Sequence, residues 1–113
     1  IYNNIKNTLP LSSKINFHFE VESNILKSSH CVMTDVFNSM NDLDDKEQIL
    51  KKFQVNEKIM SMTNDDTVFM HCLPAKIGSE VTQEVIKGNK SIVVNQAKNR
   101  MVAQRGILKW LDI

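Results

Sequence analysis

Two short, almost continuously apolar runs constrain the fold of this chain more than any other feature of its sequence. They are CVMTDV at 31–36 and TVFMH at 67–71. Continuous apolar runs of this length are typical of strands buried on both faces, as in parallel sheets. Helix-like segments lie between the strand-like runs, and strands that alternate with helices indicate βαβ units. The sequence therefore predicts an α/β fold with a parallel sheet flanked by helices.

Two further runs predict additional strands of this sheet. Lys14–Val21 alternates apolar and polar residues, which predicts an edge strand with one covered face. Ser91–Val94 predicts a fourth strand. Charge placement, apolar spacing and the position of Gly88 predict the helices, which are Glu22–Ser28, Asp42–Phe53, Asn56–Met62, Ser79–Lys87 and Gln96–Leu111. The last of them carries five apolar residues available for packing: Met101, Val102, Ile107, Leu108 and Leu111.

Polar and reactive side chains follow three of the predicted strands. Asp35 and Ser39 follow one apolar run, His71 and Cys72 close another, and Arg100 follows the predicted fourth strand. Because ligands of parallel sheets bind at the carboxyl ends of the strands, we expect these loops to converge on one cleft. Together they offer a carboxylate, a hydroxyl, an imidazole, a thiol and a guanidinium.

Each of these residues also has a purely structural interpretation. Asp35 can be a turn or N-cap residue, and Arg100 a solvated surface charge. His71 can be a histidine bonded to backbone, and Cys72 a small buried apolar residue. Pro74 can simply end the strand, or it can turn the chain sharply through a cis bond. A nucleophilic pair of Cys72 and His71 is disfavoured, because adjacent strand residues point to opposite faces.

Several classes of function receive no support from the composition. The formal net charge is +1 and no long basic block appears, so nucleic acid is not an expected partner. The apolar runs fall far short of the roughly 20 residues of a membrane span. The 3 glycines are scattered, without a phosphate-binding loop, and the 2 cysteines and 3 histidines show no zinc-type spacing. Neither a phosphate-binding loop nor a zinc site is therefore expected.

Five motifs, taken together, resemble ornithine carbamoyltransferase. They are DVFNSM at 35–40, QVNEK at 54–58, FMHCLP at 69–74, EVTQEV at 80–85 and AKNR at 97–100. The motifs follow the order and spacing of that family from about residue 14 to the end of the chain. Aspartate carbamoyltransferases carry proline where Cys72 stands, so this cysteine favours the ornithine branch. The S-M pair argues, less decisively, against putrescine carbamoyltransferase.

The resemblance implies a two-domain enzyme of which this chain is one part. The family's first domain binds carbamoyl phosphate through an S-T-R-T-R motif, which this sequence lacks. Residues 1–113 therefore resemble the C-terminal portion of the Rossmann-like ornithine-binding domain, a piece of a longer protein. The resemblance also implies a homotrimer and a final helix that packs against the first domain. With no transit segment visible, we expect a cytoplasmic enzyme, although a processed organelle protein would look the same.

The resemblance also implies roles for the substrate-binding residues. Asp35 would pair with the α-ammonium group of L-ornithine. Ser39 and Met40 would belong to a loop that closes over the amino acid and excludes water. The loop departs from the family pattern at Asn41, which stands where glycine is usual. Asparagine tolerates left-handed backbone conformations, so the turn is expected to survive.

Residues that follow the third and fourth predicted strands are expected to contact the reacting atoms of the substrates. Cys72 and the carbonyl of Leu73 would lie beside the δ-amine of ornithine, which must be neutral to attack carbamoyl phosphate. Arg100 would donate to the carbamoyl oxygen, where negative charge grows. His71 is assigned an orienting role. The residues before Arg100, Gln96–Asn99, lack the acidic residues that the family usually carries there, and we expect altered packing or charge pairing.

The function predicted by the resemblance is transfer of a carbamoyl group from carbamoyl phosphate to the δ-amine of L-ornithine, giving L-citrulline and phosphate. The resemblance implies that this reaction needs no metal and no organic cofactor. The chain alone is expected to be inactive, because it lacks the phosphate-binding motif. Two alternatives remain: a non-catalytic interaction or regulatory module on the same scaffold, and a carbamoyltransferase for another amine such as putrescine.

Overall fold

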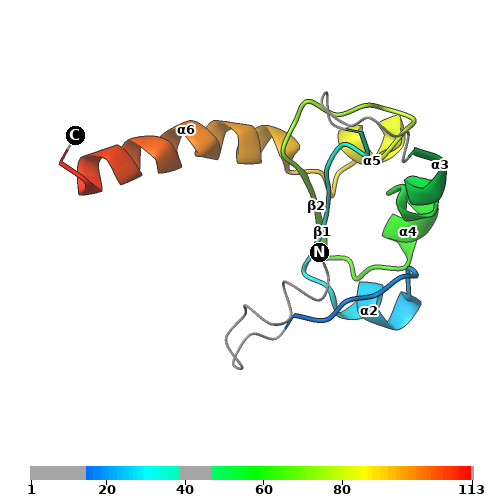
Figure 1. The fold of residues 1–113 in the computed structure, drawn as a ribbon. Coiled ribbons are helices and arrows are strands. Elements are labelled where there is room, and N and C mark those ends of the chain that lie inside the picture. Colours follow the sequence, from blue (N-terminus) through cyan, green and yellow to red (C-terminus); the bar gives the residue numbers. More distant parts are fainter. Residues whose placement is uncertain (1–14, 39–46, 113) are drawn as a thin grey trace.

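The computed structural model of the chain describes residues 15–38 and 47–112 (Figure 1). Helices surround a small parallel sheet, which confirms the predicted α/β fold class. The elements in chain order are α2 (Ser23–Ser28), β1 (Cys31–Thr34), α3 (Glu47–Leu50), the 3-10 helix η1 (Lys51–Phe53), α4 (Glu57–Ser61), β2 (Val68–His71), α5 (Gln83–Lys87) and α6 (Val93–Trp110).

The two strands of the sheet end side by side. β1 and β2 pair in parallel, and the register runs from Cys31 opposite Val68 to Thr34 opposite His71. The next residue along each strand therefore emerges at the same edge of the sheet. This register places Asp35 next to the residues that follow His71.

One strand prediction is wrong at the start of the described chain. Residues 15–22 form no strand, and the side chain of Phe19 is 72% exposed. The alternating pattern requires a neighbouring strand, and this segment instead meets Lys52 of η1. The Lys52 Nζ donates to the Phe19 carbonyl at 2.8 Å and to Glu20 Oε1 at 3.0 Å. A side-chain contact replaces the strand ladder that the pattern predicts.

The predicted strand at Ser91–Val94 is also wrong, apart from one residue. Ser91 makes a single parallel bridge to Phe69, flanked by hydrogen bonds from Phe69 N to Lys90 O and from Ile92 N to Phe69 O. Val93 is already the first residue of α6. The β-branched residues of this run favour a strand. Tertiary packing overrides that preference, because the helical start buries Val93 against the core.

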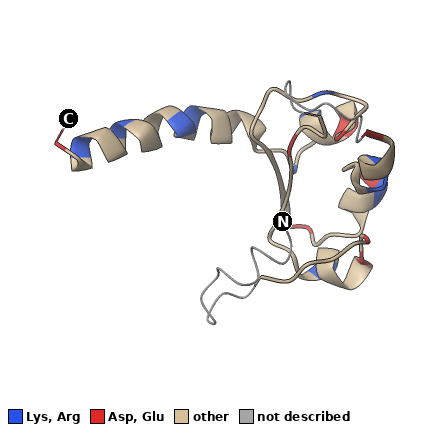
Figure 2. Ribbon diagram, viewed as in Figure 1, with Lys and Arg blue, Asp and Glu red and all other residues tan. Residues whose placement is uncertain are grey.

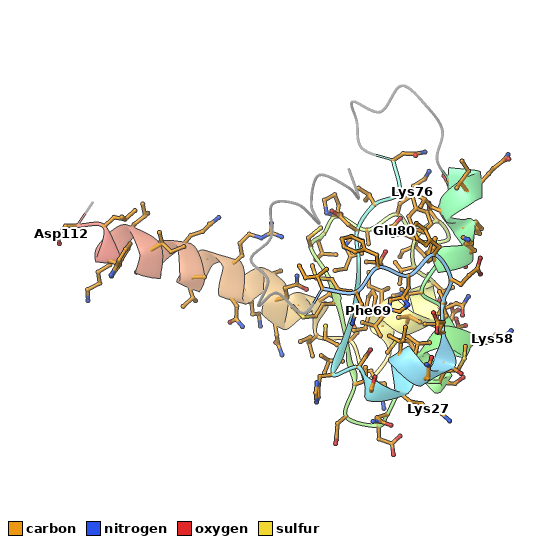
Figure 3. The ribbon with its side chains drawn as sticks, turned by 60° about the horizontal axis from the view of Figure 1, so that its bottom comes forward. Lys27, Lys58, Phe69, Lys76, Glu80 and Asp112 are labelled. Carbon is orange, nitrogen blue, oxygen red and sulfur yellow. The ribbon has the colours of Figure 1, made fainter. Side chains whose placement is uncertain are left out.

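The core lies between the sheet and the helices on one side of it. Figure 1 shows α2, α4 and α5 gathered on that side. Phe69 of β2 is completely buried, and Figure 3 shows it within the body of the fold. The other buried apolar residues are Leu26, Val55, Ile59, Met60, Val81, Val85 and Val93. The core thus draws on the helices α2, α4 and α5, the start of α6, and the strand β2.

The helix predictions hold with shifted boundaries. The predictions at 22–28 and 56–62 are confirmed by α2 and α4. The helix predicted at 79–87 starts later, at Gln83, and ends at Gly88 as expected. The helix predicted at 42–53 is seen only as α3 and η1, since residues 42–46 lie outside the described part of the chain.

Asn56 begins α4 as an N-cap residue. Its side-chain Oδ1 accepts a hydrogen bond from the Ile59 amide at 3.1 Å. We expect Asn56→Ala to lower the free energy of unfolding by about 1 kcal/mol, because that amide loses its partner. Asn56→Asp, which keeps an accepting oxygen, is the matched control. Urea denaturation of the two variants measures the difference, and equal stability of Asn56→Ala and the unchanged chain would contradict the capping role.

The last helix extends away from the body as a long arm (Figure 1). The apolar residues predicted to serve for packing are exposed in the described chain; Met101, for example, is 60% exposed. Only Val93 of α6 is buried. Figure 2 shows basic residues and no acidic ones along the helix. Across residues 15–38 and 47–112, no helix combines the length and the apolar character that a membrane crossing requires.

Candidate functional site

Three of the predicted site residues meet at the carboxyl edge of the sheet. The Cys72 thiol donates to Asp35 Oδ1 with an Sγ–Oδ1 distance of 2.9 Å. The Arg100 Nη2 donates to the carbonyl oxygen of Cys72. Asp35 follows β1, Cys72 follows β2 and Arg100 lies on α6. The carboxylate, the thiol and the guanidinium therefore form one cluster, which we call the strand-end cluster.

The remaining predicted residues are placed less completely. Leu73 follows directly in the same turn, and its bond to Pro74 is cis. Leu73 itself has a left-handed backbone with a φ of 55°. Ser39 and Met40 lie outside the described residues, as does Asn41. The roles of all these residues in binding remain predictions.

His71 is fully buried, and its ring makes a hydrogen bond to the backbone of this turn. Its Nδ1 accepts a hydrogen bond from the Leu73 amide at 2.8 Å. Its Nε2 lies 3.1 Å from Glu80 Oε1. Because Nδ1 accepts, the ring proton lies on Nε2, which donates to the carboxylate. Both ring nitrogens are thus engaged by the protein, which fits the orienting role assigned to His71.

Glu80 is the partner that sequence reasoning missed. It is fully buried, and its Oε1 also accepts the Lys76 amide at 2.6 Å. Within the described chain its second oxygen, Oε2, is buried without a hydrogen-bond partner. The sequence predicts that Glu80 lies in a helix, where a carboxylate is usually a solvated surface group. Its position within a motif shared with the family was the only signal available.

Neighbouring backbone contacts fix the position of Glu80. Val55 and Val81 form a parallel bridge, in which the Val55 amide donates to the Glu80 carbonyl at 2.9 Å. The Gln54 side-chain amide donates to the carbonyls of Gly78 and Ser79, at 2.8 Å each. The two motifs QVNEK and EVTQEV therefore lie together in space. Their contact anchors the backbone that carries the buried carboxylate.

Gln96 ties the first turn of α6 to the end of β2. Its Oε1 accepts the backbone amide of His71 at 3.0 Å. The resemblance implies an acidic residue in this stretch, and an amide oxygen accepts such a hydrogen bond as a carboxylate does. The expected change in local packing is therefore small at this position. Lys98, on the same helix, is exposed.

The hydrogen bond between Asp35 and Cys72 sets the protonation of both groups. It lowers the pKa of Asp35, helped by the Val36 amide, which donates to the same carboxylate at 2.7 Å. The same hydrogen bond raises the pKa of the Cys72 thiol, with smaller contributions from burial and from the negative charge of Asp35. At neutral pH the cluster therefore holds a carboxylate and an undissociated thiol. An undissociated thiol is a poor nucleophile, which argues against covalent cysteine catalysis.

Removing the carboxylate is expected to make Cys72 more reactive. In Asp35→Ala the pKa of Cys72 falls toward its ordinary value, so a larger thiolate fraction forms at neutral pH. Cys31, which is exposed, is replaced by serine in both proteins. Alkylation by iodoacetamide, followed by mass spectrometry from pH 6 to about pH 10, should show the Asp35→Ala profile shifted to lower pH. Coinciding profiles would show that the carboxylate does not control the thiol.

The cluster forms one open wall in the described chain. Asp35 and Arg100 are both exposed, and the thiol is half-buried. A hollow of about 300 Å³ lies elsewhere, between α4 and the end of α5, with Met60, Val85 and Lys90 among its lining residues. No set of three or more His, Cys, Asp or Glu side chains among the described residues is arranged to hold a metal ion. A ligand at the cluster would therefore need a second wall from outside the described residues.

The sequence and the fold of the chain are similar to those of known proteins. Residues 3–111 match the family model described as "Aspartate/ornithine carbamoyltransferase, Asp/Orn binding domain". The ornithine carbamoyltransferase of Rhodopseudomonas palustris is 49% identical over 87 residues, which cover 75% of the chain and 28% of that relative.

Solved structures give the same result. The ornithine carbamoyltransferase of Burkholderia thailandensis has a TM-score of 0.68 at 36% identity, over 79% of this chain and 28% of its own. The anabolic enzyme of Campylobacter jejuni has a TM-score of 0.72 at 33% identity, over 80% and 30%. The chain spans less than a third of the length of these relatives.

Proposed function

The chain belongs to the aspartate/ornithine carbamoyltransferase family, and from that premise we propose that it forms the ornithine side of the active site of an ornithine carbamoyltransferase. The complete protein transfers the carbamoyl group of carbamoyl phosphate to the δ-amine of L-ornithine, giving L-citrulline and phosphate for arginine metabolism. The names of the relatives support this reaction. The observation that carries the proposal is the strand-end cluster of Asp35, Cys72 and Arg100.

Asp35 binds the α-ammonium group of ornithine in this proposal. Its pKa is lowered, so the carboxylate is charged throughout the neutral range. The hydrogen bonds from Cys72 and Val36 occupy one oxygen, Oδ1, and fix its direction. Ser39 and Met40 remain the predicted loop that closes over the bound amino acid.

The turn after β2 receives the reacting amine. A free ornithine δ-amine has a pKa near that of lysine, about 10.4, so it must lose a proton before it attacks. The undissociated Cys72 thiol and the Leu73 carbonyl offer dipoles without a full negative charge, which favours the neutral amine. Arg100 stabilises the negative charge that grows on the carbamoyl oxygen. Most of the acceleration then comes from holding two substrates in register.

The rest of the complete protein supplies what this chain does not contain. We propose that residues 1–113 form the C-terminal portion of the ornithine-binding domain, and that a separate domain binds carbamoyl phosphate. The exposed apolar residues of α6 fit the contact with that domain, because covering an apolar surface of this kind lowers the free energy of the protein in water. The complete protein acts as a cytoplasmic homotrimer, and the isolated chain is inactive.

The proposal is tested with a hybrid enzyme. In this hybrid, the chain replaces the matching segment of the Rhodopseudomonas palustris relative, which then provides the carbamoyl phosphate-binding domain. We expect the hybrid to form citrulline from ornithine and carbamoyl phosphate. The relative without its matching segment is the control, and we expect no turnover from it or from the chain alone.

The other two candidate functions give different results in the same assay. A folded hybrid that turns over putrescine faster than ornithine would replace the proposed substrate. A folded hybrid that binds carbamoyl phosphate without turning over any amine would show that the chain is a non-catalytic module.

A further inference from the structure

We propose that Glu80 is a positioning residue for the reaction, acting through His71 to hold the Leu73 carbonyl toward the amine of the substrate. The inference rests on the proposed function and names a residue that the resemblance does not assign. The observations that carry it are two hydrogen bonds in series. Glu80 accepts from one nitrogen of the His71 ring, and the other nitrogen accepts from the Leu73 amide.

Burial makes this series rigid. His71 and Glu80 are both fully buried, so water cannot replace either contact. A buried imidazole can exchange its two nitrogens only by flipping the ring or moving its proton. Glu80 prevents both, because its carboxylate oxygen requires a proton on Nε2. Nδ1 is then always free to accept the Leu73 amide.

Leu73 needs such a contact because of its backbone. A φ of 55° lies in the left-handed region, which a leucine rarely adopts without a compensating interaction. The hydrogen bond to His71 Nδ1 fixes the plane of the peptide group before Leu73. The left-handed turn then determines where the Leu73 carbonyl points. In the proposed function this carbonyl lies beside the reacting amine.

Glu80 is itself held in place independently of His71. Its backbone carbonyl accepts the Val55 amide, and its carboxylate accepts the Lys76 amide. Figure 3 shows Glu80 inside the fold with Lys76 close to it, in the body that also contains Phe69. The buried carboxylate is therefore a fixed point against which the histidine ring is oriented.

The first test compares two replacements of Glu80 in the hybrid enzyme. Glu80→Gln keeps an accepting oxygen for His71 but no longer forces the ring proton onto Nε2, because an amide can also donate. We therefore expect a rise in the KM for ornithine that is smaller than the rise in Glu80→Leu. Glu80→Leu removes the acceptor, and we expect the KM for ornithine to rise about 10- to 100-fold. The KM for carbamoyl phosphate should stay unchanged. A purely structural role would instead lower kcat through loss of folded enzyme and leave both KM values unaltered.

The second test replaces His71 and does not depend on the folding of the Glu80 variants. The amide of His71→Asn reaches the position of Nδ1 and can accept from Leu73. The amide of His71→Gln reaches the position of Nε2 and can contact only Glu80. Positioning predicts that His71→Asn keeps a lower KM for ornithine than His71→Gln. Simple packing predicts the reverse, since glutamine fills the buried space better.

Hydrogen exchange of the 113-residue chain separates this inference from the proposed function. The peptide containing Leu73 should lose protection in His71→Gln and keep it in His71→Asn. If the unchanged hybrid shows no turnover, the proposed function fails, and this exchange result still decides whether His71 holds the Leu73 amide. Equal exchange in His71→Asn and His71→Gln, or equal KM values for ornithine in these two variants of the hybrid, would overturn the inference.

Discussion

Arg100→Ala is expected to lower the kcat of the hybrid enzyme about 100- to 1000-fold, the usual effect of removing one donor that stabilises charge in a transition state. The guanidinium lies at the strand-end cluster, where its Nη2 donates to the Cys72 carbonyl. A guanidinium has five N–H groups, so this contact leaves further donors for the carbamoyl oxygen. Because those donors act mainly as charge develops, the KM for ornithine should change much less than kcat.

Two further variants make the Arg100 result interpretable. Arg100→Lys keeps a positive charge and loses the planar fork, and we expect an intermediate loss of kcat. Arg105→Ala removes an exposed cation from the same helix, α6, away from the cluster, and it should leave kcat unchanged. Steady-state citrulline formation measures all three. A loss in Arg105→Ala as large as in Arg100→Ala would show that the helix matters only as a whole.

Asp35→Ala should raise the KM for ornithine about 10- to 100-fold, because a hydrogen bond to a charged group is worth about 1.5–3 kcal/mol and the α-ammonium loses its carboxylate. The charge of Asp35 is maintained across the neutral range by its lowered pKa. The effect should therefore be constant from pH 6 to about pH 8 and should weaken only in acid, where the carboxylate takes up a proton.

Matched controls separate the charge of Asp35 from its shape. Asp35→Asn preserves an oxygen that can accept from Cys72 and Val36, and removes the charge. We expect a KM for ornithine close to that of Asp35→Ala. Asp66→Ala removes an exposed carboxylate from the opposite end of β2 and should have no effect. Titration calorimetry with ornithine gives the dissociation constants directly, and an Asp35→Asn variant with unchanged affinity would exclude an ion pair.

The central part of the fold follows from the sequence because two local signals agree there. The runs at 31–36 and 67–71 are short, apolar and separated by helical segments, and they form the parallel pair β1 and β2. Parallel pairing brings Asp35 beside Cys72 whatever the other elements do. The strand-end rule therefore predicted the meeting of the carboxylate and the thiol without any knowledge of distances. Arg100 also reaches the cluster, but it does so from the helix α6, because the strand predicted before it does not form.

The parts that the sequence did not predict depend on contacts between distant segments. The alternation at 14–21 looks like an edge strand, but its backbone meets the Lys52 side chain. The apolar run at 91–94 looks like a strand, yet it becomes the start of α6 where Val93 enters the core. Glu80 looks like a surface carboxylate, because nothing local shows that Val55 and His71 enclose it.

A crystal structure of the hybrid enzyme with a bisubstrate analogue of carbamoyl phosphate and ornithine tests the proposed site most directly. We expect the α-ammonium of the analogue within hydrogen-bond distance of Asp35. Its δ-nitrogen should lie beside Cys72 and the Leu73 carbonyl, and its carbamoyl oxygen beside Arg100. An analogue bound with its amino-acid end away from all of these residues would contradict the assignment of the strand-end cluster as the ornithine site.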